Sequence, residues 1–120
     1  MRSGAVSLAG GRVLLTGASG GIGHAIARAF AAQGAELILA GRRVDVLESL
    51  ASELGARSIT CDLAERDQLA RLIAQAGEID VLVANAALPA TGSLTELTPA
   101  QIDAVLDVNL RAPIMLARAG

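Results

Sequence analysis

The residues best suited to chemistry form a glycine-rich loop near the start of the chain. Its sequence is Thr16-Gly17-Ala18-Ser19-Gly20-Gly21-Ile22-Gly23. An apolar run precedes the loop and a helical pattern follows it over residues 22–33, so the segment predicts a strand, a tight turn and a helix N-terminus. Glycine leaves room for an anion beside the backbone, and the unpaired N–H groups and dipole of the helix attract it. The loop is therefore typical of a pyrophosphate site, although the glycines could also serve the turn alone.

A pair of arginines follows the next predicted strand, which covers residues 36–40. Gly41, Arg42 and Arg43 come directly after that strand. The right-handed crossover places this strand end beside the glycine loop, where the adenine ribose of a bound dinucleotide would lie. An acidic residue there would bind a free 2'-hydroxyl, whereas arginine attracts a 2'-phosphate. The pair therefore favours NADP over NAD, with Ser19 as a further donor; alternatively, the arginines merely begin the next helix.

Apolar runs and helical patterns alternate along the chain, which predicts strand-helix units and a parallel sheet. The strands are expected at residues 13–16, 36–40, 57–61 and 79–84. The helices between them are expected at residues 22–33, 44–54 and 65–76. A glycine follows each of these helices, as at left-handed C-caps. The fourth strand is nearly all apolar, which is typical of a strand covered on both faces.

The pattern loosens over residues 87–96, the one long loop that we expect in the chain. The run Thr98-Pro99-Ala100-Gln101 then combines a capping residue, a proline at the first helical position and a capping-box partner, which predicts a helix to about residue 108. Pro113 cannot continue a helix unbroken. We therefore expect a kink or a new helix start between Asn109 and Pro113.

Composition narrows the class of protein. The chain has 120 residues, 52% of them hydrophobic and only Phe30 aromatic, so we expect one domain with an aliphatic core. The net charge is -2 and the basic residues are scattered arginines, which disfavours nucleic-acid binding. Cys61 and His24 are single, so neither a disulfide nor a metal cluster is expected, and we interpret them as a small core residue and a helix surface residue. No apolar run reaches the roughly 18 residues of a membrane helix, and we expect a soluble cytoplasmic protein.

Four segments together resemble the short-chain dehydrogenase/reductase family. They are the glycine loop, Asp62-Leu63 after the third strand, Asn85-Ala86-Ala87 after the fourth, and Val108-Asn109 in the fourth helix. Their order is that of the family over nearly the whole chain. The resemblance implies an α/β fold with a Rossmann-type sheet of strand order 3-2-1-4 and helices on both faces. It also implies hydride transfer between a nicotinamide cofactor and a small carbonyl or alcohol substrate, and the arginine pair makes NADP(H) the expected cofactor rather than NAD(H).

The resemblance implies a role for each segment. Asp62 would accept a hydrogen bond from the adenine amino group beside the Leu63 backbone, unless it is the N-cap of the next helix. The segment Asn85-Ala86-Ala87 would line the nicotinamide ribose, although the family usually has Asn at Ala84 and Gly at Ala87. Asn109 would support a proton relay through its backbone carbonyl, or else be an ordinary polar residue at a helix junction. The residues expected to bind the cofactor are Gly17, Ser19, Gly21, Ile22, Gly23, Arg42, Arg43, Asp62, Leu63, Asn85, Ala86 and Ala87.

The proton donor of the family's reaction is a Tyr whose pKa is lowered by a Lys, with a Ser that orients the carbonyl. This chain contains no Tyr and no Lys. We therefore expect residues 1–120 to be a single cofactor-binding domain, incomplete at its C-terminus, that can at most bind the dinucleotide. The alternative is a non-catalytic dinucleotide-binding or interaction module. In a four-stranded sheet of order 3-2-1-4, the fourth strand would be an uncovered apolar edge, so we expect aggregation or self-association into a homo-oligomer.

Overall fold

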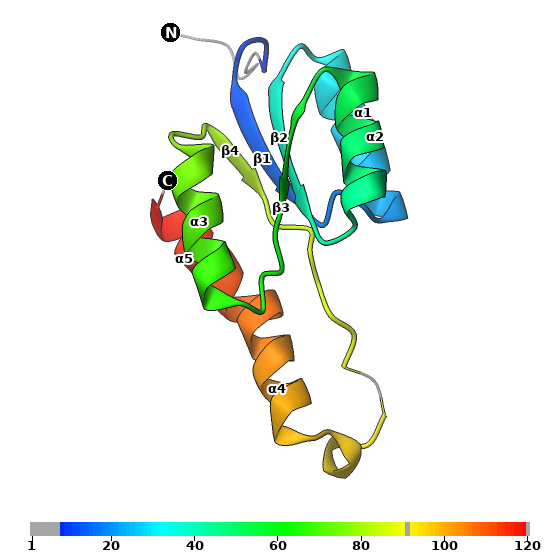
Figure 1. Ribbon diagram of the computed structural model, residues 1–120, viewed down its shortest axis with the longest axis vertical. Coiled ribbons are helices and arrows are strands. Elements are labelled where there is room, and N and C mark those ends of the chain that lie inside the picture. The colour runs from blue at the N-terminus through cyan, green and yellow to red at the C-terminus, as the bar shows by residue number, and fades with distance from the viewer. Residues whose placement is uncertain (1–7, 91, 120) are drawn as a thin grey trace, which may run out of the picture.

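A four-stranded parallel sheet forms the centre of the protein (Figure 1). The computed structural model describes residues 8–90 and 92–119. In the register, Leu14 lies beside Ile38 on one side and Leu82 on the other. The expected strand order is confirmed, since the sheet reads β3-β2-β1-β4. The strands are β1 (Arg12–Thr16), β2 (Glu36–Gly41), β3 (Arg57–Thr60) and β4 (Val81–Val83).

Helices cover both faces of this sheet, as expected (Figure 1). On one face lie α1 (Gly21–Ala32) and α2 (Val44–Leu54), and on the other lie α3 (Arg66–Ala76) and α5 (Ala112–Ala119). The helices between the strands begin and end within one residue of the expected positions. Among the described residues, no helix has both the length and the apolar character needed to cross a membrane.

Each face of the sheet has its own apolar core because successive side chains of a strand point to opposite faces. Leu15 of β1 and Leu39 of β2 pack with Leu47 in the core beneath α1 and α2. Leu14 and Leu72, by contrast, belong to the core beneath α3 and α5. All five side chains are at most 1% exposed. The two cores thus fix the strand ends and the loops that follow them.

The fourth strand departs most from expectation. The sequence predicts a strand over residues 79–84, but β4 is shorter, and its three residues are only half-buried. Its two faces are covered as expected, since Leu82 packs against one core and Val81 and Val83 pack against the other. β4 also lies at the edge of the described sheet, as the strand order predicts, so one of its sides has no neighbouring strand. Before β4, the Asp80 carboxylate accepts the Arg12 backbone N–H at 2.8 Å.

The segment after β4 runs away from the sheet before it returns along α5 (Figure 1). A short 3-10 helix, η1 (Leu94–Glu96), lies in the expected loop, and α4 (Pro99–Leu106) follows it. The expected capping box is present: the Gln101 N–H donates to Thr98 Oγ1 at 3.1 Å, and the Thr98 N–H donates to Gln101 Oε1 at 2.9 Å. None of the residues described in α4 is buried.

Pro113 accompanies a change in helical geometry after α4. The five residues of η2 (Asp107–Arg111) form a widened π-helical turn, and α5 begins directly after it. Pro113 has no N–H to donate to the carbonyl four residues earlier, which is that of Asn109. A π turn absorbs such a missing bond. The expected new start between Asn109 and Pro113 is thus confirmed, although the helical path is widened there rather than broken.

Candidate functional site

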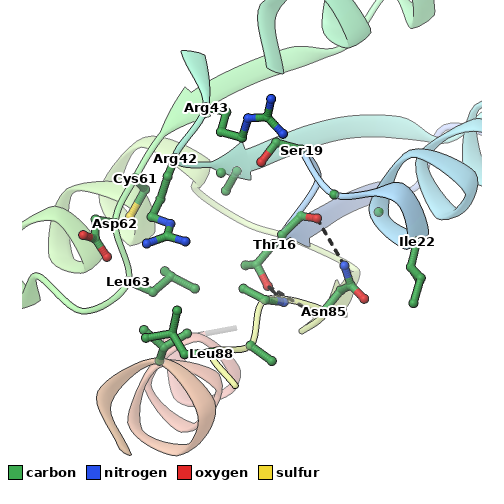
Figure 2. A pocket seen from close by; sticks show the side chains of 18 of the residues that line it. Thr16, Ser19, Ile22, Arg42, Arg43, Cys61, Asp62, Leu63, Asn85 and Leu88 are labelled. Atoms are coloured by element: carbon green, nitrogen blue, oxygen red, sulfur yellow. Dashed lines mark hydrogen bonds between the residues drawn. The ribbon is translucent and has the colours of Figure 1, made fainter. Parts of the chain in front are cut away.

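A cleft of about 410 Å³ opens where the carboxyl ends of the strands meet the glycine loop (Figure 2). All of the residues expected to bind a cofactor lie in its lining, together with several that sequence reasoning did not select. Its lining consists of Thr16, Gly17, Ser19, Gly20, Gly21, Ile22, Gly23, Ala40, Gly41, Arg42, Arg43, Cys61, Asp62, Leu63, Asn85, Ala86, Ala87, Leu88 and Val108. Such a crevice at the ends of parallel strands is the usual ligand position in α/β folds.

Two glycines of the loop are required by the protein's own packing. Gly17 has φ +66, and a Cβ there would lie 2.8 Å from both the N and the Cα of Ala86. A Cβ at Gly23 would overlap the carbonyl oxygen of Gly17 and would lie 2.8 Å from the Cα of Ala18. By contrast, a Cβ at Gly21 would meet no heavy atom of the described residues within 4 Å. The loop therefore has structural glycines on its inner side and an open one at the cleft.

The N-terminus of α1 is available to an anion. Its N-cap is Gly20, no side chain described here caps the helix, and its first turn carries no acidic residue. The loop before it is closed by backbone bonds, in which the Ala18 N–H donates to the Ala40 carbonyl at 3.1 Å. The first N–H groups of α1 and the positive end of its dipole are thus free to bind a negatively charged group.

The two arginines lie at the mouth of the same cleft. Arg43 is the N-cap of α2, and both side chains are exposed. In Figure 2 the Arg43 side chain runs toward Ser19, whereas the Arg42 side chain runs toward Leu63. Within the described residues, neither arginine takes part in an ion pair. Arg43 therefore does begin the next helix, as the alternative interpretation held, but both guanidinium groups remain available to a ligand.

Thr16, which begins the glycine loop but was not among the residues expected to bind the cofactor, ties the cleft together. Thr16 is 2% exposed, and its Oγ1 accepts the backbone N–H groups of Asn85 and Ala86, each at 3.2 Å. The Asn85 side chain in turn donates from Nδ2 to the Gly17 carbonyl at 3.2 Å. These bonds fix the end of β4 against the end of β1. The available signal was a threonine that follows the apolar run of residues 13–15 directly before Gly17.

The end of β3 contributes an acid and a thiol. Asp62 is not a helix N-cap, since that position in α3 belongs to Glu65. Instead, Asp62 Oδ1 accepts the Ala64 N–H at 3.0 Å and closes a local turn beside the cleft. Cys61 is 2% exposed, as expected of a core residue, yet it also forms part of the cleft wall. Burial, and then the Asp62 charge, raise the pKa of the Cys61 thiol to about 11, so the thiol is protonated at neutral pH.

Asn109 lies outside the cleft lining but holds part of it in place. Its Oδ1 accepts the Leu88 N–H at 2.7 Å, and its Nδ2 donates to the Leu88 carbonyl at 2.8 Å. This paired bond connects η2 to the chain that follows β4. Asn109 therefore anchors the wall of the cleft through its side chain, and the proton relay through its backbone carbonyl stays a prediction.

Comparison with known proteins agrees with this arrangement. The protein-family model described as short chain dehydrogenase matches residues 12–120. Nodulation protein G of Rhizobium sp. (strain N33) is 44% identical over 118 residues, which cover 92% of this chain and 48% of that protein. The 3-oxoacyl-[acyl-carrier-protein] reductase FabG of Rickettsia felis is 36% identical, with 94% of this chain and 48% of the reductase covered.

Solved structures give the same result. The chain superimposes on the crystal structure of a metagenomic short-chain oxidoreductase in complex with NADP with a TM-score of 0.85. That protein is 40% identical, and the match covers 95% of this chain and 56% of the other. The chain spans about half the length of the curated relatives that it matches. By its sequence, its sheet order and its glycine loop, the chain belongs to the short-chain dehydrogenase family.

Proposed function

We propose that this chain supplies the cofactor-binding part of an NADP-dependent oxidoreductase, which transfers a hydride between NADPH and a carbonyl or alcohol substrate. The observation that carries the proposal is the pair Arg42 and Arg43, unpaired in the described structure, beside the uncapped N-terminus of α1. Arginine binds phosphate through charge-assisted hydrogen bonds. A 2'-phosphate distinguishes NADP from NAD, so this pair would favour NADP.

The cleft offers a place for each part of the dinucleotide. The diphosphate would accept hydrogen bonds from the backbone N–H groups of Gly21, Ile22 and Gly23, where the open side of Gly21 leaves room for it. The 2'-phosphate would lie between the arginine pair and Ser19. When bound, the nicotinamide ring supplies or accepts the hydride.

The remaining segments would hold the two ends of the dinucleotide. Only Oδ1 of Asp62 takes part in the local turn, so its other carboxylate oxygen would accept a hydrogen bond from the adenine amino group beside Leu63. The segment Asn85-Ala86-Ala87, fixed by Thr16, would line the nicotinamide ribose. Small residues in that segment let the cofactor lie close to the backbone.

Proton transfer would require groups that this chain does not contain. Tyr and Lys are absent from the sequence. We therefore propose that the chain alone binds the dinucleotide without reducing a carbonyl, and that Asn109 acts only as a support for the relay in a longer protein. The alternative is a non-catalytic dinucleotide-binding or interaction module. Titration with NADPH and NADH tests cofactor binding, and a carbonyl-reduction assay of a longer protein that includes this chain separates the two readings.

We also propose that the chain associates with a second copy of itself. Leu106, Leu110 and Ile114 follow one another at four-residue intervals, and their side chains are 51%, 57% and 56% exposed. An antiparallel pairing of two copies about Leu110 would place Leu106 opposite Ile114. It would also bring Asp103 of each copy near Arg118 of the other, so the charges support the pairing.

A further inference from the structure

His24 contacts the glycine loop from inside the first turn of α1. Its Nδ1 lies 2.9 Å from the carbonyl oxygen of Gly20, which also accepts the His24 backbone N–H at 2.9 Å. A carbonyl oxygen can only accept, so the side-chain contact is a hydrogen bond when Nδ1 carries a proton. This bond is a property of the chain that the proposed function does not use.

The bond acts on a peptide unit that faces the cleft. The Gly20 carbonyl and the Gly21 N–H belong to one planar peptide, and both residues line the cleft. A donor on the carbonyl fixes the orientation of this plane and polarises the N–H on its other side, as in other chains of hydrogen bonds. Because no described side chain caps α1, the His24 imidazole is the side chain that holds this peptide.

The His24 ring has no competing partner in the part of the chain that the structure describes. His24 lines a second hollow, of about 370 Å³, with Arg28 of α1 and with Asp45 and Glu53 of α2. Arg28 and Glu53 form an ion pair with each other at 2.7 Å, and among the described residues His24 takes part in no ion pair. The contact with Gly20 is thus the one hydrogen bond of this ring within the described structure.

We propose that His24 is a positioning residue for the diphosphate. Its Nδ1–H donates to the Gly20 carbonyl and thereby fixes the Gly20–Gly21 peptide at the wall of the cleft. The Gly21 N–H on the other side of that peptide is then held ready for the diphosphate. This inference rests on the proposed binding of NADP.

The test compares the NADPH affinity of the unaltered chain, His24→Phe and His24→Asn. Phenylalanine removes the donor, whereas asparagine keeps a side-chain donor in the first turn of α1. We expect His24→Phe to weaken NADPH binding by about three- to tenfold. His24→Asn should retain most of the affinity.

A control ligand separates this role from loss of structure. Adenosine 2'-phosphate carries no 5'-phosphate, so its affinity should not change in His24→Phe. An unchanged NADPH affinity in His24→Phe, or an equal loss of adenosine 2'-phosphate binding, would overturn the role of His24. Failure of the unaltered chain to bind NADPH would instead overturn the proposed function, and this inference with it.

Discussion

The side chain of Asn109 is hydrogen-bonded to both backbone groups of Leu88, at 2.7 and 2.8 Å, across 21 residues of chain. Asn109 lies in the π turn η2, and Leu88 lies in the wall of the cleft. The turn that Pro113 widens thus carries the residue that holds the chain after β4. A helix irregularity and the shape of the cleft are connected through this one amide.

Replacing Asn109 with alanine should therefore affect both stability and binding. Asn109→Ala removes two exposed hydrogen bonds, so we expect the free energy of unfolding to fall by about 1 kcal/mol. NADPH affinity should fall a few-fold as Leu88 loses its position. Asn109→Asp keeps the acceptor for the Leu88 N–H but turns a second acceptor toward the Leu88 carbonyl, so it should lose at least as much. Urea unfolding and NADPH titration measure both effects; unchanged values for Asn109→Ala would show that the paired bond holds nothing in place.

The end of β2 should set the choice between the two nicotinamide cofactors. An aspartate in place of Gly41 would repel a 2'-phosphate and would accept a hydrogen bond from a free 2'-hydroxyl. Its Cβ would lie 3.0 Å from Ser19 Oγ, so the substitution is made in a Ser19→Gly background to avoid that contact. We expect Gly41→Asp to weaken NADPH binding by about tenfold or more and to retain or improve NADH binding.

The matched control is Gly41→Asn in the same background, which adds nearly the same volume without the charge. It should weaken NADPH binding much less than Gly41→Asp. Equal losses in the two variants would mean that steric exclusion, rather than charge, acts at this strand end.

The buried thiol predicts a stability change at alkaline pH. The pKa of Cys61 is raised from 9.0 to about 11, first by burial and then by Asp62, against a smaller lowering by Arg71. The folded chain thus keeps this proton to higher pH than the unfolded chain. The resulting stabilisation is complete below pH 9 and is lost as the pH rises toward 11.

Urea unfolding of the unaltered chain and of Cys61→Ala, at about pH 8 and about pH 10.5, isolates this contribution. The unaltered chain should lose on the order of 1–2 kcal/mol more than the variant between the two conditions. A thiol reagent should also react slowly with the folded chain at neutral pH. Parallel losses in both proteins, or rapid modification, would contradict the assignment of a protonated, buried thiol.

Self-association should depend on the three exposed apolar residues Leu106, Leu110 and Ile114, with Leu110 of η2 at their centre. Leu110→Glu would place two like charges at the centre of an antiparallel pair, so we expect the variant to sediment as a monomer where the unaltered chain sediments as a dimer. Leu94→Glu is the control, because Leu94 is 76% exposed but lies in η1 outside that pairing. An unaltered chain that sediments as a monomer, or a dimer that survives Leu110→Glu, would exclude this surface.

Features that depend on local sequence could be predicted closely. The capping box at Thr98 and the left-handed glycine at Gly55 follow from residue types within a few positions, and both are present. The strand order follows from the alternation of strands and helices together with the handedness of crossovers. The positions of Arg42 and Arg43 at the cleft follow in turn from that order.

Features that depend on distant contacts could not be predicted in the same way. Thr16 reaches Asn85 and Ala86 across about 70 residues, and no local pattern indicates that pairing. The glycine loop alone leaves open whether Gly17 serves the turn, the ligand or packing, and only the folded chain shows that Ala86 blocks its Cβ position. Whether a side of β4 is exposed depends on which segments pair with it. Such properties are fixed only when the chain segments are brought together.

The most direct test of the account is the cofactor preference of the chain and of the double variant Arg42→Ala with Arg43→Ala, measured by titration with NADPH and NADH. The unaltered chain should bind NADPH at least about tenfold more tightly than NADH, and the double variant should lose that preference while keeping its NADH affinity. Arg118→Ala, which removes a charge in the last turn of α5, should retain the preference. Binding of neither dinucleotide, or tighter binding of NADH by the unaltered chain, would contradict the account.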